Sequence, residues 1–204
     1  MPTANSQKVA ALPKNVYLCS VNNNDYIMEN LQKNDIQDVA TYCGLVLLKE
    51  GMTVSPLKLQ KMLYYVQAWM MVFYDRQLLF DDKPQAWVNG PVYPSVYDRF
   101  KSIGRYDMMK KGDFIQEGTL TEGIELMEKR MGLTQNQLDV LHRLIAIYGS
   151  KTQDQLVFMT HCEDPWSIAR GDLGPFENSD TPISFDDMYS FYKARYEANR
   201  KARG

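Results

Sequence analysis

The two histidines are the first residues to test for chemistry, because one of them adjoins a cysteine. His161 stands beside Cys162, and these are the residue types of a thiolate–imidazole nucleophile. Successive residues of a helix point about 100° apart, so the pair would not face each other. Glu163 and Asp164 follow at once, and acidic neighbours disfavour a reactive thiolate. His142 fits a structural position within a helix. We therefore expect that the protein has no catalytic centre and is not an enzyme. The alternative is a hydrolase that uses His161 and Cys162.

Metal and phosphate sites find equally little support. The adjacent acids at 81–82 and 186–187 diverge on any regular element, and a turn or a helix start explains them better. Cys19, Cys43 and Cys162 are odd in number and far apart, which fits neither a disulfide framework nor a zinc site. No glycine-rich phosphate loop has the required spacing. We therefore expect no metal and no cofactor, and a reducing cytoplasm.

Composition narrows the class further. The chain has 204 residues, of which 45% are hydrophobic, so it can bury one substantial core. A net charge of −2 disfavours a nucleic-acid interface, and the basic residues near the C-terminus fit a solvated helix end. The longest apolar stretch, 62–74, is too short to span a bilayer, and residues 1–12 lack the apolar run of a signal peptide. These features predict a cytoplasmic protein that binds neither DNA nor membrane.

Helical periodicity and capping residues predict most of the fold. Ser55 and Pro56 mark a clear helix start, and an apolar stripe follows as far as Phe73. Lys58, Lys61 and Gln67 lie off that stripe. Further helices are predicted at 37–50, 94–100 and 122–131, at 134–149 and from 152 to Pro165, each of the last two opened by a capping box, and from Ser184 onward.

Strand signals are few and short. Residues 85–88 form a short extended segment before the chain break at Gly90-Pro91, and 114–115 is a second candidate strand. The apolar burst 16–19 is a third, or a docking segment. We predict a mainly α fold, a compact multi-helix domain with two or three short marginal strands. Residues 1–35 form a polar, partly disordered N-terminal extension, and 36–204 form the helical domain with its basic C-terminal tail.

Three motifs occur in a fixed order along this domain. The segment LKLQKMLYY at 57–65 leads an aromatic helix, AW at 86–87 precedes GPV at 90–92 and Tyr97, and HCEDPW occupies 161–166. Together they resemble the SocA-like antitoxin domain, also called the Panacea or GepA-like domain, over about residues 36–196. The resemblance implies an antitoxin of a type II toxin–antitoxin system, often phage-associated, that neutralises a co-encoded protein toxin by direct binding.

The resemblance, together with aromatic character, suggests where the partner binds. The predicted partner-binding residues are Lys61, Tyr64, Tyr65, Trp87, Gly90, Pro91, Tyr93 and Tyr97. The predicted structural motif comprises Trp69, His161, Pro165 and Trp166, with His161 hydrogen-bonding near Trp166. Large aromatic residues are also typical of cores, so each tryptophan taken alone favours a core position, and Gly90-Pro91 favours a rigid turn.

Other functions remain open at this point. A proteolytic adaptor that delivers the toxin to a protease is a close alternative, and a phage-associated nucleic-acid-binding regulator is a more distant one. Some relatives carry an added helix-turn-helix, but the 35-residue extension is too short and too polar to hold one. The partner expected is the toxin encoded by an adjacent gene, in a hetero-oligomer or with the chain as a homo-oligomer.

Overall fold

Helix α2 (Pro56–Phe73) is the centre of the structure, a computed structural model that describes residues 29–202. It begins as predicted, with Pro56 in the first turn and the Ser55 hydroxyl accepting a hydrogen bond from the Lys58 N–H at 3.1 Å. Every residue from Leu57 to Phe73 is buried. The apolar stripe is therefore only part of the buried surface, because the helix is enclosed on all its faces.

Enclosure of α2 places polar side chains inside the protein, where each needs a partner. Lys58 Nζ donates to the Gly149 carbonyl at 2.7 Å. The Gln67 amide donates to the Phe80 carbonyl at 3.0 Å and accepts from the Leu79 N–H at 3.2 Å. These bonds tie α2 to the loop that follows it and to the end of a neighbouring helix.

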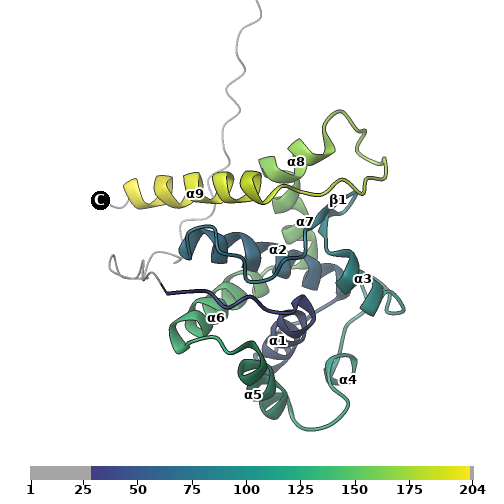
Figure 1. The fold of residues 1–204 in the computed structure, drawn as a ribbon. Coiled ribbons are helices and arrows are strands. Elements are labelled where there is room, and N and C mark those ends of the chain that lie inside the picture. Colours follow the sequence, from purple (N-terminus) through teal and green to yellow (C-terminus); the bar gives the residue numbers. More distant parts are fainter. Residues whose placement is uncertain (1–28, 203–204) are drawn as a thin grey trace, which may run out of the picture.

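Other helices pack around α2 on both sides. Figure 1 shows α9 (Phe185–Lys201) along one side and α1 (Ile36–Lys49) with α6 (Gln135–Gly149) on the other, with α5 (Leu120–Met131) beyond them against α1. Each of the predicted helices in this group is present. Helix α5 begins two residues earlier than predicted because Thr119 and Glu122 form its capping box.

The segment after α2 contains a hairpin. Strands β1 (Gln85–Trp87) and β2 (Gly90–Val92) pair antiparallel, with Trp87 opposite Gly90. Gly90-Pro91 was predicted to break the chain, and it forms the second strand instead. Helix α3 (Pro94–Phe100) follows as predicted. The prediction of a strand at 114–115 is wrong, because Phe114 ends the single helical turn α4 (Lys111–Phe114) and Ile115 is the C-cap of that turn.

Two short helices complete the layer near the hairpin. Helix α7 (Gln153–His161) has the predicted capping box of Thr152 and Gln155. It ends at His161, earlier than the predicted stop at Pro165. Pro165 instead lies in the first turn of α8 (Asp164–Arg170), where a missing N–H leaves no helical hydrogen bond unmade.

The mainly α prediction is confirmed, since the described part of the chain has nine helices and a single two-stranded sheet. The segment 16–19 and the N-terminal dozen residues lie outside the described residues. The end of the predicted extension packs on the domain, where Leu31 is buried and its N–H donates to Gln77 Oε1 at 2.6 Å. Within residues 29–202, no helix is long and apolar enough to cross a membrane.

Candidate functional site

Lys61 of α2 reaches the back of the hairpin. Its side chain is fully buried, and Nζ donates to the Pro91 carbonyl at 2.9 Å. Burial lowers the pKa of Lys61 to about 7, because a low-dielectric interior disfavours the ammonium. Lys61 was predicted to contact a partner at the surface, and that placement is wrong. It holds strand β2 against α2.

Gly90 lets the hairpin approach this lysine. Its φ is +90°, a conformation that other residues rarely adopt. A Cβ on Gly90 would lie 2.6 Å from the Thr160 hydroxyl oxygen and 2.7 Å from Lys61 Cε, which is closer than atoms can pack. Gly90 and Pro91 are both buried. Both belong to strand β2 and the turn lies before them, at residues 88–89, so the simpler prediction of a rigid turn at Gly90-Pro91 is two residues out; their burial also contradicts their prediction as partner-binding residues.

His161 and Trp166 support the hairpin from α7 and α8. Their rings stack with centroids 4.1 Å apart and planes 17° from parallel, and His161 also hydrogen-bonds to the backbone of Val88, next to the Trp87 carbonyl that Trp166 contacts. Trp166 Nε1 donates to the Trp87 carbonyl at 3.0 Å, and Pro165 beside it is buried. Burial, with the nearby charge of Lys61, lowers the pKa of His161, while the hydrogen bond to the Val88 backbone acts to raise it.

Three tyrosines predicted to bind the partner are inside the core. Tyr64, Tyr65 and Tyr93 are all fully buried, so their predicted placement on the surface is wrong. Tyr65 stacks on Tyr148 with ring centroids 4.0 Å apart, and Tyr64 meets Tyr192 edge-on at 6.1 Å. Burial raises the pKa of each of the three hydroxyls. These residues stabilise the domain and cannot contact a partner in this conformation.

Trp69 and an ion pair lie in the same aromatic region. Trp69, predicted as structural, is buried, and its Nε1 donates to the Tyr148 hydroxyl at 2.5 Å. Glu163 accepts from the Tyr192 hydroxyl at 2.5 Å and pairs with Arg195 at 2.9 Å. Burial raises the pKa of Glu163 to about 7, although Tyr192 and Arg195 both act to lower it. Sequence patterns did not identify this pair, because its members are far apart along the chain.

Arg170 is the most consequential residue that sequence reasoning missed. It is buried at the end of α8, and its NH1 donates to the Ala86 carbonyl of β1 at 3.1 Å. Its NH2 donates at 2.7 Å to both the Gly174 and the Glu177 carbonyls. One guanidinium therefore connects the hairpin to the loop 171–182. A basic residue near a helix end was the only sequence signal, and it is common.

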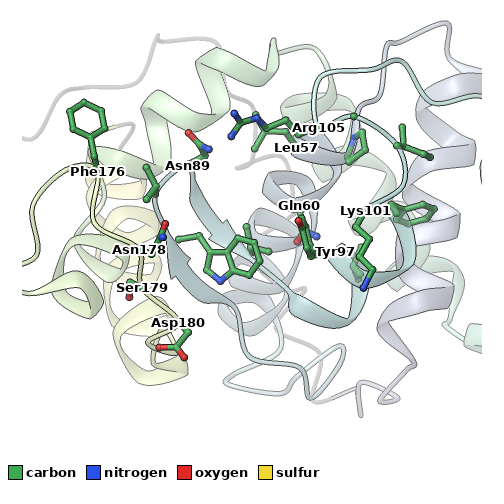
Figure 2. Close-up of a pocket in the computed structure, with 18 residues that line it drawn as sticks. Leu57, Gln60, Asn89, Tyr97, Lys101, Arg105, Phe176, Asn178, Ser179 and Asp180 are labelled. Carbon is green, nitrogen blue, oxygen red and sulfur yellow. The ribbon is translucent and has the colours of Figure 1, made fainter.

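The hairpin and this loop border an open groove with a volume of about 940 Å3 (Figure 2). Its lining comes from the start of α2, the hairpin, α3, the segment 101–105 and the segment 176–180. Trp87 and Tyr97 are the only predicted partner-binding residues that line it, with ring centroids 4.9 Å apart. Tyr97 is 43% exposed, and Phe176 across the groove is 88% exposed. The groove is the candidate binding site.

The cysteines and His161 are the residues that could take part in a reaction. Cys162 is exposed at the end of α7, while His161 Nε2 is buried, and the structure shows no hydrogen bond between the two residues. Cys43 is buried in α1, and burial raises its thiol pKa to about 12, which keeps the thiol protonated. Across residues 29–202, no group of three or more histidines, cysteines and carboxylates is placed to hold a metal ion.

The chain is similar to a known protein family. No curated protein and no solved structure matches the chain significantly. The model of one family, described as the antitoxin SocA-like, Panacea domain, matches residues 59–167. The matched region runs from α2 to α8 and holds the hairpin, Lys61, Gly90, His161 and Trp166. Because it covers more than half of the 204 residues, the chain belongs to the antitoxin SocA-like, Panacea domain family.

Proposed function

We propose that this chain is an antitoxin that neutralises a co-encoded protein toxin by binding it directly, with the groove as the contact surface. Its family supports the antitoxin role. The observation that carries the choice of surface is the exposure of Tyr97 and Phe176 on opposite sides of a groove whose backbone is held by buried donors. We also propose that the chain acts in the cytoplasm and performs no reaction of its own.

The physical case rests on anchors and rigidity. Tryptophan, tyrosine and arginine dominate the energy of protein interfaces, and Trp87, Tyr97 and Arg105 all line the groove. Affinity also depends on how little freedom the surface loses on binding. Lys61, Trp166 and Arg170 each donate to a hairpin carbonyl, so the backbone under the aromatic side chains is already fixed. A groove of this kind can cover a toxin surface without reorganising.

The test is growth rescue when the chain is produced together with the protein encoded beside it. We expect the double change Tyr97→Ala and Phe176→Ala to abolish rescue, because it removes the two exposed aromatic anchors. The matched control is Phe158→Ala, because Phe158 is 69% exposed on α7 and does not line the groove. Thermal unfolding of the unchanged chain and the two purified variants should show that all three proteins are folded.

Two outcomes would overturn the proposal. Rescue that survives the double change, or is lost equally with Phe158→Ala, would remove the groove as the contact surface.

The adaptor alternative is tested by the amount of toxin in the same cells. Direct neutralisation leaves the toxin intact in a stable complex, whereas delivery to a protease makes it disappear.

A further inference from the structure

The two sides of the groove carry opposite charges. Lys101 and Arg105 belong to the segment after α3, and Asp180 belongs to the segment on the facing side (Figure 2). Between them, Trp87, Val88, Val92 and Val96 make up an apolar floor. An occupant therefore meets apolar surface in the middle, positive charge along one edge and negative charge along the other.

The backbone of Arg105 is hydrogen-bonded, whereas its guanidinium pairs with no carboxylate among residues 29–202. Its carbonyl accepts from the Leu57 N–H at 3.1 Å, which fixes the segment to the start of α2. Its guanidinium lies 5.2 Å over the Tyr106 ring, and within the described part of the chain it forms no ion pair or hydrogen bond. Lys101 pairs at 3.0 Å with Asp98, but both side chains are more than half exposed, so water screens that pair.

Asp180, on the opposite wall of the groove, also combines a fixed backbone with an unpaired charged group within the described residues. The backbone beside it is fixed, because the Ala86 N–H donates to the Thr181 carbonyl at 2.9 Å and Arg170 holds the preceding turn. Among residues 29–202, nothing pairs with the Asp180 carboxylate, and the Asn178 amide makes no hydrogen bond. Both walls therefore hold their backbones in place and leave polar ends available to a partner.

The openness of the groove favours a protein segment over a small molecule. Small-molecule sites enclose most of the ligand surface and use a few buried polar groups to orient it. Here the polar ends of Arg105, Asn178 and Asp180 are exposed, and so is the Phe176 ring. Exposed aromatic side chains above an apolar floor fit an amphipathic segment that lays its apolar face into the groove.

We propose that the groove binds a segment of the toxin that has an apolar face, a carboxylate on the edge toward Arg105 and Lys101, and a cationic side chain on the edge toward Asp180. This inference rests on the proposed function, and it adds the chemistry and the orientation of the bound segment. Opposite charges at the two edges permit one direction of binding and oppose the reverse, because like charges would then meet.

The experiment measures the dissociation constant of the purified full-length chain with the co-encoded protein at low and at high salt. We expect Arg105→Glu and Asp180→Lys each to weaken binding about tenfold or more at low salt, and less at high salt. The control charge reversals are Arg143→Glu on α6 and Glu197→Lys on α9, which are exposed and lie outside the groove. They should change the constant by less than about twofold.

A reciprocal exchange identifies the edge that each wall contacts. In the co-encoded protein, each Asp and Glu is changed singly to Lys. We expect one of these variants to bind the unchanged chain more weakly and to bind the Arg105→Glu chain with restored affinity. Single Lys or Arg to Glu changes should include one that restores binding to Asp180→Lys. The restored pairs would report direct contacts, because a general loss of folding cannot be repaired by one charge on the partner.

The outcomes separate this inference from the proposed function. If the Tyr97→Ala and Phe176→Ala variant loses binding while both groove reversals keep it, the groove is the contact surface and the charge assignment is wrong. If the co-encoded protein does not bind the chain at all, the proposed function is wrong, and this inference is wrong with it. If the free chain is a dimer that the aromatic double change dissociates, a second copy occupies the groove, which also overturns the inference.

Discussion

The two faces of the hairpin differ in every property that matters for binding. Behind it, Lys61, Trp166 and Arg170 reach the carbonyls of Pro91, Trp87 and Ala86 from inside the protein. In front of it, several groove side chains have exposed ends and make no hydrogen bond to any of residues 29–202. The residues that mark the family therefore lie mostly on the supporting side, and the proposed contact surface is on the other side.

This difference separates fold from specificity. Donors that bind backbone carbonyls hold the hairpin whatever side chains it carries on its front face. The front face can then be altered with little effect on the core. Changes behind the hairpin should lower stability and binding together, while changes in the groove should lower binding alone.

Arg170→Met should have the largest effect. It removes three hydrogen bonds and leaves the Ala86, Gly174 and Glu177 carbonyls without this donor, so we expect a loss of about 4 kcal/mol in the free energy of unfolding. Denaturant unfolding measures it, with Arg143→Met on the exposed face of α6 as the control. Equal stabilities for the two variants would show that the loop is held by other contacts.

Gly90→Ala should be the next largest. The added Cβ meets Thr160 and Lys61 at a positive φ, so strain and overpacking should together cost about 3 kcal/mol. Gly51→Ala is the matched control, because Gly51 also has a positive φ, +69°, but open space around the new atom. Its cost should be about 1 kcal/mol, from backbone strain alone. Similar costs at both positions would mean that the hairpin can move away from α2.

Lys61→Met should change how stability depends on pH. Between pH 7 and 10.5 the unfolded chain binds a proton at Lys61 that the folded chain does not, so raising the pH through this window stabilises the folded protein. The variant keeps the apolar stem and lacks the amine. From pH 7 to 9, the unchanged chain should therefore gain about 2 kcal/mol relative to the variant in urea unfolding. Parallel pH curves would show that Lys61 stays charged when buried.

Cys162→Ala should have the smallest effect. The thiol is exposed and stands apart from the groove, so growth rescue and the free energy of unfolding should both stay unchanged. A thiol reagent should label Cys162 quickly in the folded chain and Cys43 only after unfolding, since Cys43 is buried and its pKa is raised. Loss of rescue in Cys162→Ala would revive the hydrolase alternative.

Local signals explain which elements were predictable. Ser55, Thr134 and Thr152 cap their helices through hydrogen bonds to residues three positions away, so a short stretch of sequence contains the whole interaction. Strand β2 is three residues long and carries no comparable signal. Its conformation depends on a distant partner, Lys61. Helix α4 is a single turn of four residues, in which the Lys110 N–H donates to the Asp113 carboxylate.

The binding residues were harder to predict than the motif. Tyr64 and Tyr97 are the same residue type and both lie in helices, yet one is fully buried and the other is 43% exposed. A helix period shows which residues share a face, but it does not show how many faces have neighbours. Because α2 is enclosed on every side, the aromatic residues predicted for its surface are in the core. Arg170 and Phe176 had no motif to mark them.

The amino-acid sequence alone determined the helical class, most helix starts and the family of this protein, because capping residues, periodicity and motif order act over short stretches of chain. The folded chain was needed to show that Lys61 and three tyrosines are buried, and that Trp87, Tyr97 and Phe176 lie around one groove. Burial and convergence involve segments more than a hundred residues apart, such as those of Tyr64 and Tyr192, and they arise when hydrophobic packing brings those segments together.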